Sequence, residues 1–92
     1  MTDFENKAIG LIETTGLLGA IATADIMKKS SFVETSVVRI DGIYFTVVAY
    51  GDYDAVKIAI EKGLEAGEKI CKILAYVIIG RPSQEIIDFY IK

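Results

Sequence analysis

The residues best suited to acid–base, redox or metal chemistry are scarce in this chain. Its 92 residues include no histidine, the commonest general base and metal ligand in proteins. The single cysteine, Cys71, has no second thiol for a disulfide, a redox pair or an iron–sulfur site, so a buried structural thiol is expected. Carboxylates are numerous, but most recur at a helical spacing that is typical of a solvated face. We therefore expect no catalytic residue, no metal site and no cofactor.

Patterns that bind phosphates or membranes are also missing. Gly16 and Gly19 do not open a strand–GxGxxG–helix unit, and no P-loop motif occurs. The net charge of −3 argues against a nucleic-acid partner, which would need a basic surface. No apolar run approaches the roughly 20 residues that cross a bilayer, and residues 1–7 are too polar for a secretory signal. These features predict a cytoplasmic protein that binds neither nucleic acid nor membranes.

The apolar pattern alternates between strand and helix periods and predicts the framework of the chain. Segments rich in Val, Ile, Thr and aromatic residues predict strands at 8–13, 32–40, 43–50 and 72–79. The last of these is apolar on both faces, which predicts a central position in the sheet. Helical spacing predicts two helices, whose apolar stripes are Leu17, Ala20, Ile21, Ala24 and Met27 in the first and Val56, Ala59, Ile60, Gly63, Gly67 and Ile70 in the second.

Turn and cap residues mark the ends of these elements. Asp41-Gly42 predicts a two-residue type I′ hairpin turn, because that turn needs positive φ at both positions. Thr14 or Thr15 is expected to cap the first helix, and Asp52 the second. Ser83 is expected to cap a last short helix. Lysines in the last turn of the first helix suit the negative end of its dipole.

The resulting order is β-α-β-β-α-β with a short C-terminal helix. This order predicts a ferredoxin-like α+β fold, an antiparallel sheet with two helices on one face. We expect residues 1–92 to form a single domain, with a core at about 7–83 and the last helix at about 83–91. The hydrophobic fraction of 52% is high for so small a chain and predicts apolar surface that is buried against other copies.

Four stretches, taken in order, resemble the bacterial microcompartment shell domain. They are residues 8–17 (AIGLIETTGL), 24–30 (ADIMKKS), 46–52 with Ala55 and Val56 (TVVAYGD, then AV), and 77–82 (VIIGRP). Each stretch alone is a weak signal, whereas the ordered set covers residues 7 to 83 without a large gap. The resemblance implies a structural subunit that forms flat hexameric discs, which tile edge to edge into a shell and pass metabolites through a central pore.

The resemblance also implies roles for particular residues. Lys29 matches the family's lysine at the contact between discs, and Arg81 matches the arginine that reaches into the adjoining disc. The family's pore loop corresponds to Arg39, Ile40, Asp41, Gly42, Ile43 and Tyr44. This loop has one glycine where the family often has Gly-Ser-Gly, and it lacks the cysteine of the subclass that holds an iron–sulfur cluster. The segment is either an ordinary Asp-Gly hairpin or a pore rim that carries Asp41, with Ile43 or Tyr44 as a constriction.

The implied partners are further copies of the chain, in a homohexamer, and other shell proteins. Enclosed enzymes are a further class of partner that the resemblance allows, and the implied location is the microcompartment shell in the cytoplasm. Two other readings of the same topology are a small-molecule-binding regulatory domain and an acylphosphatase-type enzyme. The regulatory domain would need a ligand pocket at a subunit interface. The enzyme would need an arginine in an early phosphate loop, but both arginines, Arg39 and Arg81, lie elsewhere.

Overall fold

Four antiparallel strands form one sheet, in the order β2-β3-β1-β4. The computed structural model describes residues 6–91. The first five residues, on which the argument against a secretory signal partly rested, and Lys92 lie outside this range. The elements are β1 (Lys7–Thr15), α1 (Leu17–Ser30), β2 (Glu34–Asp41), β3 (Tyr44–Asp52), α2 (Tyr53–Gly67), β4 (Ile73–Gly80) and α3 (Gln84–Tyr90). Their order and pairing confirm the ferredoxin-like α+β fold.

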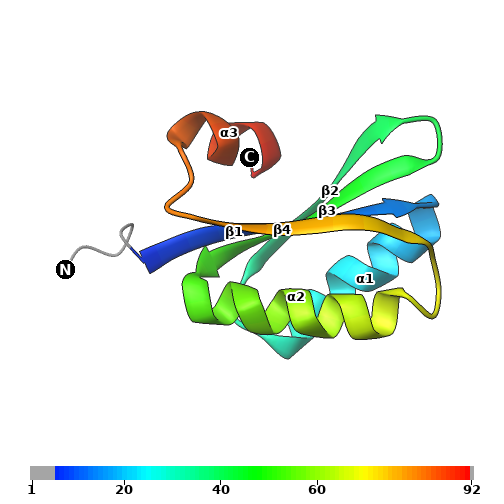
Figure 1. The fold of residues 1–92 in the computed structure, drawn as a ribbon, viewed down its shortest axis with the longest axis horizontal. Helices are drawn as coiled ribbons and strands as arrows, with labels where there is room; N and C mark the ends of the chain where they lie inside the picture. The colour runs from blue at the N-terminus through cyan, green and yellow to red at the C-terminus, as the bar shows by residue number, and fades with distance from the viewer. Residues whose placement is uncertain (1–5, 92) are drawn as a thin grey trace.

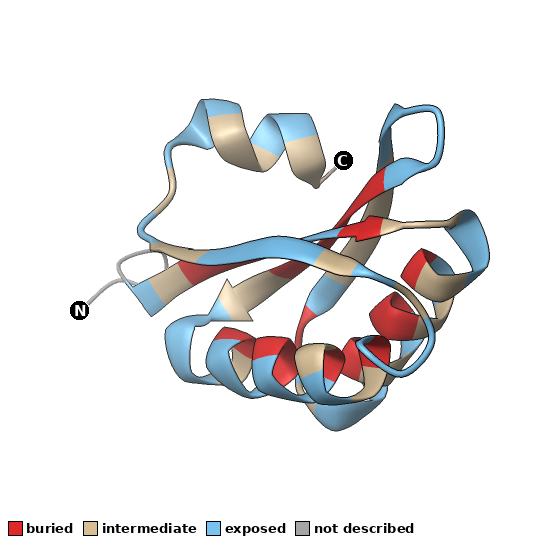
Figure 2. Cartoon of the chain, turned by 45° about the vertical axis from the view of Figure 1, so that its right-hand side comes forward, coloured by how far each residue is buried: buried red, intermediate tan, exposed pale blue. Residues whose placement is uncertain are grey.

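The helices divide between the two faces of the sheet (Figure 1). Both α1 and α2 lie on one face, α1 over β2 and β3 and α2 over β1, β3 and β4. The short α3 lies on the other face, where none of its residues is fully buried (Figure 2). Ser36 ties this helix to the sheet, because its hydroxyl donates a hydrogen bond to the carbonyl oxygen of Tyr90 at 2.7 Å.

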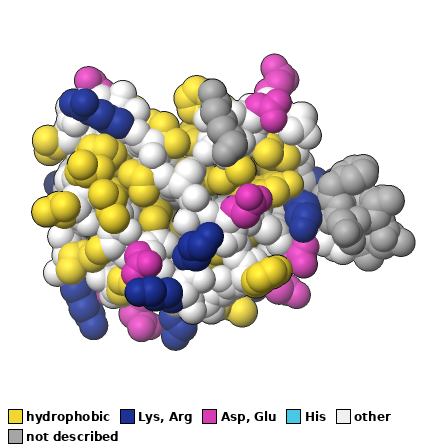
Figure 3. Space-filling model, turned by 180° about the vertical axis from the view of Figure 1, so that it is seen from behind, with side chains coloured by type: hydrophobic (Ala, Val, Ile, Leu, Met, Phe, Trp, Pro, Cys, Tyr) yellow, Lys and Arg dark blue, Asp and Glu magenta, His cyan; other side chains and the backbone are white. Residues whose placement is uncertain are grey.

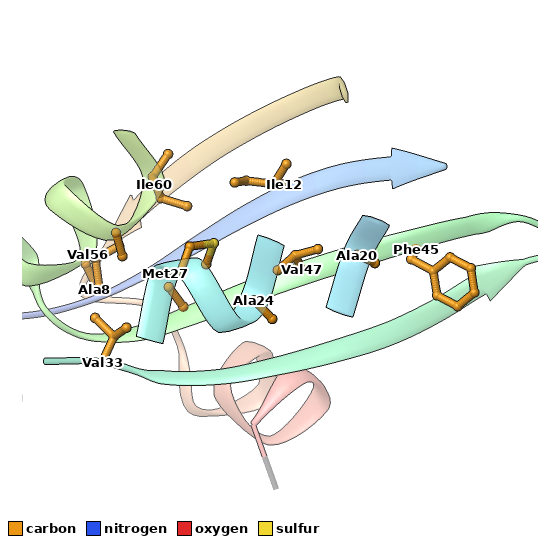
Figure 4. Packing of buried hydrophobic residues seen from close by; sticks show 12 residues of the cluster. Ala8, Ile12, Ala20, Ala24, Met27, Val33, Phe45, Val47, Val56 and Ile60 are labelled. Atoms are coloured by element: carbon orange, nitrogen blue, oxygen red, sulfur yellow. The ribbon is translucent and has the colours of Figure 1, made fainter. Parts of the chain in front are cut away.

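The core fills the layer between the sheet and the helices α1 and α2 (Figure 4). Alternate residues of the two central strands point into it, among them Ile12 of β1 and Val47 of β3, which are register partners. Met27 of α1 and Ile60 of α2 meet them from the helical side. Removing these side chains from water supplies the main favourable term in folding so small a domain.

Two glycines of α2 allow the helices to approach closely. A Cβ at Gly63 would lie 2.8 Å from Met27, and one at Gly67 would lie 2.9 Å from the Thr23 hydroxyl. With this contact, the side of α1 that faces the core differs from the predicted apolar stripe. Thr23 is buried, while Leu17 and Ile21 are about half exposed. The α2 stripe was predicted one turn too long, because the helix ends at Gly67 and leaves Ile70 exposed.

The predicted central position of β4 is wrong, because β4 is an edge strand. Leu74, Tyr76 and Val77 are all substantially exposed on it. A strand that is apolar on both faces is typical of the interior of a sheet. The same pattern arises on an edge strand whose apolar side chains are left for contacts outside the subunit. Sequence alone does not separate these two cases.

The predicted caps are only partly confirmed. The Ser83 hydroxyl accepts a hydrogen bond from the Ile86 amide, as expected. Gly16, rather than either threonine, occupies the N-cap of α1, with φ +84° that glycine adopts without strain. Asp52 does occupy the N-cap of α2, but its carboxylate pairs with Lys7 at 3.2 Å instead of capping the helix.

Gly10 of β1 is a core position that has no room for a side chain. A Cβ there would lie 2.6 Å from two carbons of Ile60 and 2.9 Å from Val56, both of which are buried. We expect Gly10→Ala to lower the free energy of unfolding by about 1–3 kcal/mol through overpacking. The melting temperature should fall by at least about 4 °C for a domain of this size. The matched control is Gly80→Ala, where an added Cβ meets nothing within 4 Å. Equal melting temperatures of the two variants at one protein concentration would contradict this account of the core.

Candidate functional site

The predicted site residues separate into two groups, at opposite ends of the strands. The molecule is 39 Å long, and its strands run along that length (Figure 1). The β2–β3 hairpin, with the whole predicted pore loop, forms one end. The other end holds Arg81, where β4 finishes beside the first residue of β1, and Lys29 in the last turn of α1. The fold thus separates the pore-loop candidates from the edge candidates, and it places Lys29 and Arg81 at the same end.

The hairpin turns one residue later than the sequence predicted. Asp41 pairs with Tyr44, so the two turn residues are Gly42 and Ile43. Gly42 has φ +54°, whereas Ile43 has an ordinary negative φ. Positive φ at the first turn position alone fits a type II′ turn with glycine there, rather than type I′. Ile40 is left as a bulge in the β2–β3 pairing.

Two hydrogen bonds hold this tip in place. The Gly16 amide donates to the Ile43 carbonyl oxygen at 2.7 Å, which joins the hairpin to the start of α1. The Arg39 Nε–H donates to the Gly42 carbonyl oxygen at 3.1 Å, which folds the guanidinium back onto the turn. All six residues from 39 to 44 are exposed. The tip therefore presents a fixed loop that carries one cation, one carboxylate, two isoleucines and a tyrosine to solvent.

Arg81, at the opposite end, has an unusual backbone conformation. Its φ of +48° is the sole positive value on a non-glycine residue among residues 6–91. Its amide donates to the Lys7 carbonyl oxygen at 2.9 Å, which fixes the end of β4 against β1. A left-handed conformation costs a non-glycine residue roughly 1–3 kcal/mol and is concentrated at functional sites. Arg81 is also exposed to solvent.

Lys29 lies on the exposed side of the last turn of α1, beside a carboxylate of the preceding turn. Its ammonium forms an ion pair with Asp25 at 2.8 Å. The hydrogen bond and the charge of Asp25 raise the pKa of Lys29 above its usual value. A raised pKa keeps the ammonium protonated as pH rises, so Lys29 is a fixed cation under physiological conditions.

Exposed apolar side chains lie along the two flanks of the sheet, and among them only Ile43 was predicted as a site residue, in the pore loop. The first group, here called the α1 flank, consists of Leu17, Ile21 and Ile43, which line a shallow groove beside β2. The second group, the β4 flank, consists of Leu74, Tyr76 and Val77 on the opposite edge strand. Hydrophobic side chains gather at one end of the side seen in Figure 3. The high apolar content of the chain was the signal for such surfaces, but it did not say where they lie.

The described residues show no evident catalytic cluster. Within residues 6–91, no three His, Cys, Asp or Glu side chains are grouped so that they could hold a metal ion. Cys71 is half-buried rather than fully buried, and its thiol donates to the Gly67 carbonyl oxygen at 3.4 Å. No helix in the described part of the chain is long and apolar enough to cross a membrane.

The structure is an α+β domain with exposed apolar flanks on both sides of a small sheet and charged residues at its two ends. Surfaces of this kind are typical of domains that associate with other protein chains. Comparison with known protein families identifies the class. Residues 8–82 match the model of the BMC domain, so the chain belongs to the BMC domain family.

Several proteins similar to this chain are named as carboxysome or bacterial microcompartment shell proteins. It is 40% identical over 88 residues to the carboxysome shell protein CsoS1A of Hydrogenovibrio crunogenus, a match that covers 94% of this chain and 91% of that protein. It is 35% identical over 83 residues to the bacterial microcompartment shell protein PduA of Citrobacter freundii, which covers 89% of each chain.

Other similar proteins are longer than this chain. The match to the probable carboxysome shell protein CsoS1E of Prochlorococcus marinus, at 40% identity over 81 residues, covers 86% of this chain but 40% of that protein. The crystal structure of a microcompartments protein from Desulfitobacterium hafniense shares the fold, with a TM-score of 0.77 at 22% sequence identity. That alignment covers 87% of this chain and 44% of the other.

Proposed function

We propose that this shell subunit assembles into a closed ring of six copies with a pore at its centre, and that such rings tile into a shell layer. The observation that carries the proposal is the pair of apolar flanks on opposite edges of the sheet. The fraction of side chain exposed reaches 61% at Ile43 on the α1 flank and 60% at Tyr76 on the β4 flank. Surfaces of this kind on a small domain favour burial against another protein.

The placement of the flanks favours a ring over a symmetric dimer. A two-fold dimer would bury one flank against its own copy and leave the other exposed. If the α1 flank of one copy packs on the β4 flank of the next, every copy buries both. Such a head-to-tail interface must either close into a ring or continue as a filament. The resemblance to shell proteins favours closure with six copies.

The two ends of the subunit then acquire different roles. The hairpin tip faces the ring axis, where six copies of the loop from Arg39 to Tyr44 form the pore rim. The end that carries Lys29 and Arg81 faces outward and meets neighbouring rings. An arginine suits this outer position, because its planar guanidinium can bind several carbonyl groups at once.

The role that follows is structural and involves no catalysis. The whole chain acts as one shell domain, located in the microcompartment shell within the cytoplasm. Its partners are further copies of itself, other shell proteins and, on the inner surface, enclosed enzymes. The alternative of a small-molecule-binding regulatory domain gains no support from the comparisons, in which relatives that match over most of the chain are shell proteins.

Lys29 and Arg81 provide a direct test of the proposed outer edge. We expect Lys29→Ala and Arg81→Ala to form rings of wild-type mass but to tile poorly, because the ring is held by apolar flanks that neither residue joins. The protein concentration at which sheets appear in electron micrographs should rise by about tenfold, as for the loss of about 1.4 kcal/mol per contact.

A matched control is Lys62→Ala, which removes an exposed lysine from the middle of α2. The control should tile like the wild type. Sheets of undiminished extent in both the Lys29→Ala and Arg81→Ala variants would remove these residues from the edge.

Asp41 tests the proposed pore. Six copies of its carboxylate would surround or lie near the axis, and acidic rings repel anions. We expect Asp41→Asn to increase the flux of small anions through tiled layers by about three- to tenfold, which corresponds to a change of one to a few kT in local potential. Glu61→Gln on the exposed side of α2 removes the same charge elsewhere and should leave the flux unchanged. Unchanged flux in Asp41→Asn with an intact ring would mean that Asp41 is only a hairpin residue.

A further inference from the structure

Phe32 is the most exposed large hydrophobic residue among residues 6–91. It lies in the short loop between α1 and β2, and 98% of its surface is accessible to solvent. Single exposed apolar residues are common on protein surfaces and need no explanation by themselves. Phe32 differs from such residues in how firmly its backbone is held and in what surrounds it.

The loop that carries Phe32 is anchored on both sides. The Ser31 hydroxyl donates a hydrogen bond to the Ala55 carbonyl oxygen at 2.7 Å, and the Val33 amide donates to the Ser31 carbonyl oxygen at 3.1 Å. Val33 is buried in the core, and a Cβ at Gly51 would lie 3.2 Å from the Phe32 carbonyl oxygen. The aromatic ring therefore projects from a fixed backbone, and little ordering entropy is lost when it binds a partner.

The surroundings of Phe32 have the composition of a protein–protein contact. A shallow groove beside it is lined by Lys7, Lys28, Val33, Glu34, Tyr50, Gly51 and Asp52. Its lining combines aromatic and aliphatic residues with two lysines and two carboxylates. Interfaces join apolar and polar residues in this way, and aromatic residues are enriched among their strongest contributors.

The charged residues that line this groove favour a second copy of this chain as the partner. Two cations balance two anions, whereas a surface for nucleic acid or anionic lipid would carry one sign. Within residues 6–91, neither Lys28 nor Glu34 forms an ion pair in its own subunit. A surface that carries both signs can pair with itself across a two-fold axis, with Lys28 of one copy opposite Glu34 of the other.

We propose that Phe32 anchors an isologous contact between two copies of this chain that belong to neighbouring rings. The inference rests on the proposed ring and its outer edge, and it assigns the apolar centre of that edge. Phe32 follows Lys29 by one helical turn in sequence, and its groove shares Lys7 and Asp52 with the end of the sheet where Arg81 lies. Identical rings that meet edge to edge are related by a two-fold axis, so the same surface occurs on both sides of the contact.

The test compares three variants of the full chain. Phe32→Ser should form rings of wild-type mass but should need about a tenfold or greater protein concentration to form sheets, since a central aromatic anchor is lost. Phe32→Leu keeps an apolar anchor and should tile at close to the wild-type concentration. Phe89→Ser removes another exposed aromatic residue, on α3, and should tile like the wild type. Mass in solution reports the ring, and electron microscopy with light scattering reports the sheets.

Several results would overturn the inference. Sheets of Phe32→Ser at the wild-type concentration would show that the ring edge does not use this side chain. Loss of the ring in Phe32→Ser would show that Phe32 contacts a neighbour within the ring instead. Equal loss of tiling in Phe89→Ser would show that tiling depends on general surface hydrophobicity and not on Phe32 in particular. If the wild-type protein forms neither rings nor sheets, the proposed function itself fails. Wild-type tiling with an unaffected Phe32→Ser variant refutes only the role of Phe32.

Discussion

The packing of α1 and α2 on one face of the central strands is the constraint on which the rest of the structure depends. Ile12 and Val47 meet Met27 and Ile60 in a core that admits no added carbon at Gly10. Because β1 and β3 run through this core, their ends are fixed relative to each other. The same two strands therefore hold the hairpin at one end and the Lys7–Asp52 pair, next to Arg81, at the other.

A core of this size cannot bury all the apolar residues of a chain that is 52% hydrophobic. Part of the surplus lies along two opposite flanks of the sheet and at Phe32, and the rest lies on other surfaces, with Leu18 and Phe89 its most exposed members. We assign the flanks to contacts within a ring and Phe32 to contacts between rings. These two roles follow from where the residues lie. Flanks on opposite edges of the sheet suit a head-to-tail contact, whereas the groove beside Phe32, which carries charges of both signs, suits a contact with the same groove of another copy.

The sequence predicted the order of elements and the family well, because periodicity and ordered motifs are local properties of the chain. It placed the hairpin turn one residue early, since Asp-Gly is compatible with more than one turn type and the bulge at Ile40 shifts the register. It placed β4 in the centre of the sheet because exposed apolar side chains on an edge strand give the same sequence pattern as core residues. The exposure of Leu17, Ile21 and Phe32 depends on tertiary packing and had no signal of its own.

Closure of a ring by the two apolar flanks can be tested by measuring the mass of the purified protein in solution. The subunit has a mass of 10.1 kDa. Sedimentation equilibrium and native mass spectrometry should both give a species of six times this mass that persists on dilution into the low micromolar range. A monomer or a two-fold dimer at every concentration would contradict the account, because either state would leave at least one flank exposed to water.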